Sequence, residues 1–208
     1  MLTIEGADFL EGRLGRLEDV YQRGVRSLQL VHYRINEVGD IQTASPKHGG
    51  LTPFGRDVVR EANGLGMVID LAHATFEVTK AVVDLSIRPV MISHTNLQDD
   101  VGSPRFVSRE HARLVADAGG LIGAWPFSPQ PRFSAFIDRI IRLVDVVGPD
   151  HVAIGTDMDG LGPYAVFGDY AHWPSIPAAL LARGVARADI AKLMGENFRR
   201  LFKAVAGQ

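Results

Sequence analysis

Five ionisable side chains stand at the ends of short apolar runs in this sequence. They are Glu5 in "TIEG", His32 in "LVHY", His73 in "LAH", His94 in "ISH" and Asp157 in "GTD". Imidazole and carboxylate groups are the usual ligands of hydrolytic zinc sites, which keep one position open for water. Because the chain contains no cysteine, histidine and carboxylate must supply the ligands of any transition metal. These residue types therefore predict a metal-dependent hydrolytic site.

The apolar runs alternate with longer segments of helical period. Segments 52–66 and 74–86, for example, carry apolar residues at helical spacing. This alternation predicts a parallel sheet covered by helices, in which functional side chains converge where the strands end and the loops begin. The five residues are thus expected to share one rim. Strands are expected in 2–6, 26–33, 67–73, 89–95, 120–127 and 151–160.

Each of the five residues also has a purely structural explanation. A lone histidine at a strand end is more often a hydrogen-bonded core residue than a ligand. Glu5 could be a solvated turn residue, and Asp157 could belong to an ordinary turn. The coincidence favours the functional interpretation, because five unpaired charges are costly to desolvate and a shared metal ion would compensate them.

Composition limits the partners and the compartment. The chain has 208 residues, of which 46% are hydrophobic and 22% are charged, with a net charge of −2, so we expect one domain spanning 1–208. It has no basic block suited to nucleic acid. No apolar run is long enough to cross a bilayer, and the first residues lack the layout of a secretion signal. The default compartment is the cytoplasm, although an N-terminally shortened chain would have lost any signal peptide.

Four stretches form a specific set in their order and spacing: "LVHYRIN", "GGLTPFGRDVVREANGLGMVIDLAH", "PVMISHTN" and "HVAIGTDMDG". Together they resemble the signature sequences of the renal or membrane dipeptidase family, the M19 metallopeptidases. The similarity runs through essentially the whole chain. It implies the (β/α)8 TIM-barrel fold of the metal-dependent hydrolases, a site for two zinc ions, and hydrolysis of dipeptides by a metal-bound hydroxide.

The resemblance also implies a set of metal ligands. Glu5 corresponds to the carboxylate that bridges the two metals, and His73 and His94 correspond to ligands of the second metal. The His-x-Asp pair with which the family begins does not precede Glu5. A complete barrel has eight strands and ~250 residues, so the sequence predicts about six of eight βα units and an N-terminally truncated chain. We therefore expect one zinc to bind more readily than two, and the chain to hydrolyse dipeptides poorly or not at all.

Three further residues receive roles through the resemblance. His32 corresponds to the histidine that contacts the substrate carbonyl oxygen, and Asp157 to the acid/base carboxylate. Arg105, in "GSPRFVS", corresponds to the arginine that binds the substrate, and its forked guanidinium suits a carboxylate. Members of this family often pair, so a homodimer is one option for this chain, and the sequence leaves its oligomeric state open.

Two other functions stay open on the sequence. The same rim residues could serve an amidase or a lactonase that acts on non-peptide substrates. The chain could also be a catalytically silent binding protein on the same fold, which the absence of the His-x-Asp pair would favour.

Overall fold

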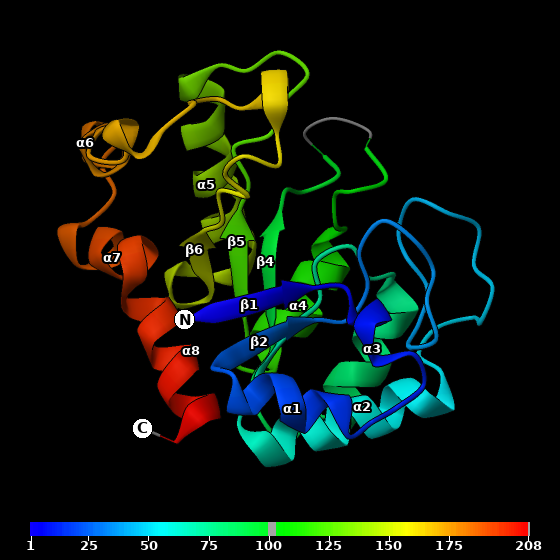
Figure 1. The fold of residues 1–208 in the computed structure, drawn as a ribbon. Coiled ribbons are helices and arrows are strands. Elements are labelled where there is room, and N and C mark those ends of the chain that lie inside the picture. Colours follow the sequence, from blue (N-terminus) through cyan, green and yellow to red (C-terminus); the bar gives the residue numbers. More distant parts are fainter. Residues whose placement is uncertain (100–102, 208) are drawn as a thin grey trace.

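The structure is a computed structural model that describes residues 1–99 and 103–207. Its centre is a sheet of six parallel strands, which follow one another across the sheet in their order along the chain (Figure 1). Each strand overlaps the segment in which it was predicted, which confirms the α/β class. The strands are β1 (Leu2–Glu5), β2 (Val25–Gln29), β3 (Val68–Asp70), β4 (Met91–Thr95), β5 (Leu121–Ala124) and β6 (Val152–Ile154).

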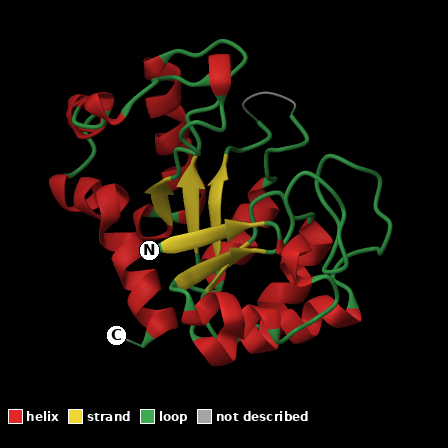
Figure 2. Ribbon diagram, in the orientation of Figure 1, coloured by secondary structure: helices red, strands yellow, loops and turns green. Residues whose placement is uncertain are grey.

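Helices follow the strands and lie on the outer face of the sheet (Figure 2). Successive helices from α1 to α5 contact one another, so they form a continuous layer. The α-helices are α1 (Arg16–Gln22), α2 (Pro53–Leu65), α3 (Phe76–Leu85), α4 (Arg109–Asp117), α5 (Phe133–Val147), α6 (Ser175–Ala182), α7 (Arg187–Ala191) and α8 (Asn197–Ala206). Short helical segments are η1 (Ala7–Leu10), η2 (Pro149–His151), η3 (Gly162–Tyr164), η4 (Tyr170–His172) and the π-helical η5 (Lys192–Glu196).

Side-chain caps fix where three of these helices begin. Thr52, Thr75 and Ser108 precede α2, α3 and α4, and each side-chain oxygen accepts a hydrogen bond from a backbone N–H of the first turn. Such caps satisfy donors that have no partner within the helix. Gly66 ends α2 in the left-handed conformation, at a φ of 72°. Each helix start is thereby set close to the preceding strand or rim loop.

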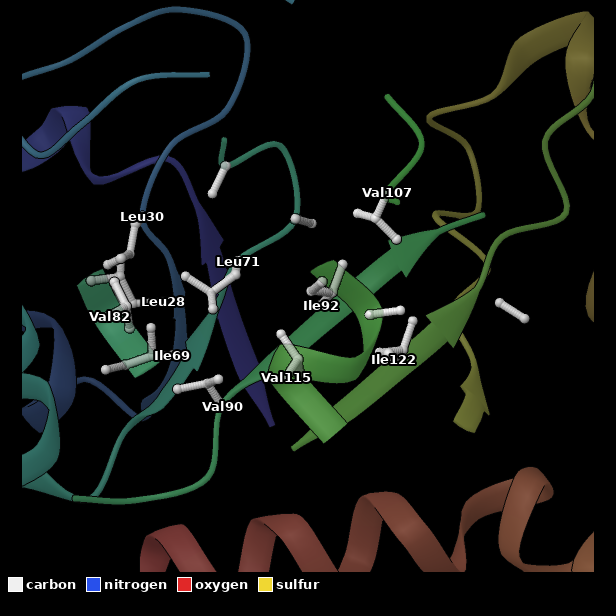
Figure 3. Close-up of a cluster of buried hydrophobic side chains, with 14 of the residues drawn as sticks. Leu28, Leu30, Ile69, Leu71, Val82, Val90, Ile92, Val107, Val115 and Ile122 are labelled. Carbon is white, nitrogen blue, oxygen red and sulfur yellow. The ribbon is translucent and has the colours of Figure 1, made fainter. Parts of the chain in front are cut away.

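The main core lies between the sheet and the helical layer. Figure 3 shows side chains of β2, β3, β4 and β5 that meet side chains of α3 and α4. Burial of this apolar surface is the main favourable contribution to folding. The residues labelled there are Leu28, Leu30, Ile69, Leu71, Val82, Val90, Ile92, Val107, Val115 and Ile122.

The C-terminal helix α8 covers the amino ends of the strands. Its Leu201 and Val205 form a separate apolar cluster with Val68, Met91 and Leu121, which stand at the starts of β3, β4 and β5. The opposite, carboxyl ends of the strands remain free of this helix. The rim at which the sequence predicts chemistry is therefore at the end of the sheet opposite α8.

The sheet does not close into a complete barrel within the described residues, where β1 and β6 each pair on one side only. A cavity of about 500 Å³ lies inside the curved sheet, and its lining includes residues of both edge strands. Among the described residues, no helix is both long enough and apolar enough to cross a membrane.

Candidate active site

The five strand-end residues lie at the carboxyl ends of their strands, as predicted. Glu5 is the last residue of β1, and His94 lies within the last residues of β4. His32, His73 and Asp157 each follow a strand by three residues, after β2, β3 and β6. Glu5, His94 and Asp157 line the cavity inside the sheet. The topology thus brings side chains from five strands to one rim.

Three histidines form the centre of this rim. The Nε2 atoms of His73 and His94 are 3.3 Å apart. The ring centroids of His32 and His73 are separated by 4.6 Å, and those of His73 and His94 by 5.3 Å. The three imidazoles are therefore close enough to act on one small molecule.

The site holds His73 and His94 in their neutral forms. Burial, the positive charge of Arg105 and the neighbouring histidines lower the pKa of His73 to about 2. Burial and the same arginine lower the pKa of His94 to about 3. A neutral imidazole has a free nitrogen lone pair, which is the form that binds metals. Both side chains are therefore ready to act as ligands near neutral pH.

The spacing of His73 and His94 fits a zinc ion, but the described residues place no third ligand beside this pair. Two nitrogens at about 2.0–2.1 Å from a tetrahedral zinc lie about 3.3 Å apart, which matches the Nε2–Nε2 distance of 3.3 Å between His73 and His94. Within residues 1–99 and 103–207, no three histidine, aspartate or glutamate side chains are placed to hold an ion together. Glu5 instead lies 3.3 Å from Nε2 of His32. The complete set of Glu5, His73 and His94 remains a prediction.

An irregularity of the β-bulge kind interrupts β4 beside His94. The register with β5 shifts between Ile92 and Thr95, and such bulges re-aim side chains next to active sites. The turned Ser93 carbonyl enters space that only glycine leaves open. A Cβ atom at Gly123 or Gly155 would lie 1.8 or 1.7 Å from that oxygen. The two glycines therefore permit the bulge.

Arg105 joins the site from the loop after β4. Its Nη1 donates a hydrogen bond to Gln42 Oε1 at 2.7 Å, and its Nη2 lies 3.3 Å from His94 Nε2. The guanidinium carbon is 5.3 Å from the centre of the Trp125 ring, within the range of a cation–π interaction. Burial lowers the pKa of Arg105 to about 10, partly offset by nearby acidic groups. The arginine is therefore charged near neutral pH and held in place.

Gln42 ties the long loop after β2 to the site. Its backbone N–H donates to the His73 carbonyl at 2.9 Å, while its side chain accepts from Arg105. The loop is ordered by Asp40, whose carboxylate accepts hydrogen bonds from the backbone of Lys47, His48 and Gly50. The loop therefore contributes a side chain to the rim.

Asp157 has the properties of an acid/base group. Burial and the charge of Glu5 raise its pKa to about 6, although Arg105 opposes the shift. The Trp125 indole N–H opposes the shift as well. This N–H has no hydrogen-bond partner of ordinary geometry among the described residues. The space for the carboxyl depends on Gly160, where a Cβ would lie 2.4 Å from Asp157 Oδ1. A pKa near neutrality suits proton transfer.

Two of the rim residues hold left-handed backbone conformations. The φ angle is 69° at His73 and 46° at Asp157. Non-glycine residues adopt this region uncommonly, and such conformations gather at functional sites. The backbone conformations at these two positions support a functional role.

The sequence did not single out three residues that the structure places in or beneath the site. Gln42 and Trp125 both contact Arg105, and Asp70 lies buried beneath the rim and accepts a hydrogen bond from the backbone of Ser93. Asp70, in an otherwise apolar strand, carried a usable signal, because a buried carboxylate requires partners. Gln42 and Trp125 carried none.

Comparisons with known proteins identify the family and the fold of the chain. The sequence profile of the family described as membrane dipeptidase, peptidase family M19, matches residues 1–207. The chain is 32% identical to dipeptidase tcpJ of Claviceps purpurea over 99% of its own length and 50% of the fungal protein. It is 30% identical to dipeptidase verJ of Clonostachys rogersoniana, over 99% of this chain and 55% of that protein. The chain thus spans about half the length of the curated relatives it matches.

Solved structures show the same fold over part of their length. A metallopeptidase from Rhodobacter sphaeroides, solved with a phosphinate mimic of the dipeptide L-Ala-D-Ala, is 25% identical with a TM-score of 0.87, over 99% of this chain and 63% of that chain. An amidohydrolase from Pseudomonas aeruginosa is 26% identical with a TM-score of 0.90, over 99% of this chain and 72% of that chain. The six strands correspond to part of such a TIM-barrel-like hydrolase fold. From the profile match over nearly its whole length, the chain belongs to the membrane dipeptidase family, peptidase family M19.

Proposed function

We propose that this chain forms the substrate-binding and proton-transfer part of a zinc-dependent dipeptidase. One observation carries the proposal: two neutral histidines face each other at the spacing that zinc requires, beside a charged, half-buried arginine. The relative from Rhodobacter sphaeroides, a metallopeptidase solved with a dipeptide mimic, supports a dipeptide as the substrate class.

His73 and His94 would hold a zinc ion through their Nε2 atoms, with Glu5 as the predicted third ligand. Bound zinc supplies Lewis-acid chemistry, because it polarises a carbonyl group and lowers the pKa of water toward neutrality. The remaining parts of the reaction belong to this chain's own side chains.

Arg105 would bind and orient the dipeptide. A dipeptide has a free carboxylate, and a guanidinium binds carboxylates through two parallel hydrogen bonds. Gln42 and the Trp125 ring hold the guanidinium from two sides. Because the arginine is fixed before substrate arrives, little conformational entropy is lost when the substrate binds.

His32 and Asp157 would manage charge and protons. His32 lies beside His73, with its Nε2 near Glu5, and can donate a hydrogen bond to the oxygen that becomes negative during attack. Asp157, with its raised pKa, can accept a proton near neutral pH and deliver it to the departing amine. Removal of one such oxyanion donor costs about 2.7–4 kcal/mol of transition-state stabilisation in known cases.

The proposal is tested by zinc analysis and a dipeptide hydrolysis assay on this chain and on a version extended at its amino end. We expect the short chain to bind about one zinc and to show little activity. The extended chain should bind more zinc and be more active, and Asp157→Asn in the extended chain should lose that activity. An exposed substitution, Asp84→Asn on α3, is the matched control. Full activity in the zinc-free protein would refute the proposal.

One observation favours a second function, ligand binding without catalysis. The described residues gather two zinc ligands and not three, so these two ligands alone would hold an ion weakly. In that case dipeptides would bind without being hydrolysed, Arg105→Ala would abolish binding, and added zinc would change neither the affinity nor the absence of hydrolysis.

A further inference from the structure

Tyr33 presents an aromatic ring at the mouth of the site. It follows His32 in the loop after β2 and is 77% exposed. Single exposed aromatic residues are common on protein surfaces and by themselves indicate nothing. Tyr33 differs because its ring lies against two histidines of the site. Its centroid is 3.9 Å from that of His32 and 5.7 Å from that of His73. The ring therefore stands beside the groups that would act on a peptide bond.

The loop that carries Tyr33 is closed at its base by a buried asparagine. Asn36 Nδ2 donates a hydrogen bond to the Leu30 carbonyl at 3.0 Å, and Asn36 Oδ1 accepts one from the backbone N–H of Val38 at 2.9 Å. A tyrosine side chain has only two torsions to fix, so it loses little conformational entropy when a ligand covers it. The ring is therefore a contact surface that exists before a ligand arrives.

The hydroxyl of Tyr33 also lies within electrostatic range of Arg105. Burial lowers the pKa of Arg105 to about 10, and among the groups that oppose this shift Tyr33 is second only to Asp157. The ring contacts the histidines while the hydroxyl acts on the guanidinium. Tyr33 thus borders both the end of the site proposed to hold the peptide carbonyl and the end proposed to hold the carboxylate.

The covalent structure of a dipeptide determines which part of it such a ring would face. Only the amide nitrogen and the Cα atom of the carboxyl-terminal residue separate the peptide carbonyl from the carboxylate. With the carbonyl at His32 and the carboxylate at Arg105, as proposed above, this Cα atom lies between the two, beside Tyr33. The side chain that it carries is the part of this residue that differs from one dipeptide to another.

We propose that Tyr33 is a specificity-determining residue whose ring contacts the side chain of the carboxyl-terminal residue of the dipeptide and favours apolar and aromatic side chains there. The inference rests on the proposed function, from which it takes the dipeptide and its contact with Arg105. A side chain that covers the ring removes apolar surface from water. An aromatic pair contributes about two- to tenfold in affinity beyond this burial. Glycine, which has no side chain, gains neither.

Calorimetry with dipeptide mimics that are not hydrolysed measures this preference directly. The probes are phosphinate mimics of Ala-Gly, Ala-Leu and Ala-Phe, with both configurations of the second residue, titrated into the chain in the presence of zinc. The wild type should bind the leucine and phenylalanine mimics more tightly than the glycine mimic. In Tyr33→Ala the ratio of phenylalanine to glycine affinity should fall by about two- to tenfold, and the leucine ratio should fall less. Tyr33→Phe, which keeps the ring, should retain both ratios.

The ratio of affinities separates a contact with the ligand from damage to the site. If loss of the ring merely displaced His32, all mimics would bind more weakly by the same factor, and the unchanged ratio would overturn the proposal. Ile87→Ala is the matched control. Ile87 is 82% exposed and lies between α3 and β4, at the end of the sheet opposite the rim, so its loss should change no affinity.

Two further outcomes are decisive. A Tyr33→Phe variant with the low ratio of Tyr33→Ala would assign the effect to the hydroxyl and overturn the ring contact. If no mimic binds to the wild type, the proposed function fails and the inference fails with it. If the mimics bind but their affinity ratios do not respond to Tyr33→Ala, the inference alone fails and the proposed function stands.

Discussion

The Gly155→Ala substitution should displace the β4 bulge and weaken the fold. A methyl group at this position would lie 1.7 Å from the Ser93 carbonyl oxygen, whereas real contacts of this kind essentially never fall below 3.0 Å. Either the backbone of Ser93 in β4 or the backbone of Gly155, just after β6, must therefore move by about 1.3 Å in a close-packed interior. Ser93 cannot swing aside freely, since its N–H is bonded to Asp70 at 2.9 Å.

Overpacking of a core typically costs about 1–3 kcal/mol, occasionally more. Since the obstacle here is backbone, we expect the free energy of unfolding to fall by at least about 2 kcal/mol, measured by urea denaturation followed by circular dichroism. The folded fraction should also bind zinc more weakly, because the movement separates His94 from His73.

The control is Gly64→Ala in α2, where a methyl group would meet no atom within 4 Å. It should leave stability unchanged or raise it by up to about 1 kcal/mol, because alanine favours helix over glycine. If both variants matched the wild type in stability and zinc affinity, the bulge would not depend on glycine and the reasoning would fail.

Three further predictions concern charge and metal. Because the pKa of His94 is lowered to about 3 in the folded protein, folding disfavours its protonated form. The stability of the metal-free wild type relative to His94→Gln should therefore decrease as the pH falls from 6.5 toward 3. Melting temperatures of the two proteins that change in parallel across this range would contradict the shift. Zinc at a hundred times its dissociation constant should raise the free energy of unfolding by about 2.7 kcal/mol. The melting temperature should rise with zinc and fall again with EDTA, and an unchanged melting temperature would show that zinc does not bind preferentially to the folded state. Arg105→Lys should raise KM for dipeptides more than it lowers kcat in an active form of the protein, because lysine cannot form two parallel bonds to a carboxylate; an unchanged KM would remove Arg105 from substrate binding.

The strand-end rim was predictable from sequence because two simple regularities determine it. Alternating strands and helices force a parallel sheet, and the carboxyl ends of its strands meet at one edge. His73 and His94 could therefore be placed together before any coordinates, and the structure confirms their proximity. Glu5 lies at the same rim, but its carboxylate is 3.3 Å from His32 Nε2, a side-chain contact that strand position does not decide.

Other parts of the site depend on tertiary contacts that no local pattern encodes. Gln42 reaches Arg105 across 63 positions of the chain, and the path of its loop is set by the buried Asp40 carboxylate. Strand lengths were overestimated for a related reason. The apolar run that includes β3 continues to Ala72, but the strand ends at Asp70, and the chain then reaches the left-handed conformation at His73.

The left-handed backbone at His73 decides which replacements are informative there. At a φ of 69° a β-branched residue would strain the turn itself, so a valine variant would confuse loss of the imidazole with a damaged backbone. Asparagine tolerates this conformation better than other non-glycine residues, and His73→Asn removes the imidazole while the chain keeps its course. The same choice applies at Asp157, where φ is 46°, whereas His94 sits in a strand and accepts a wider range of substitutes.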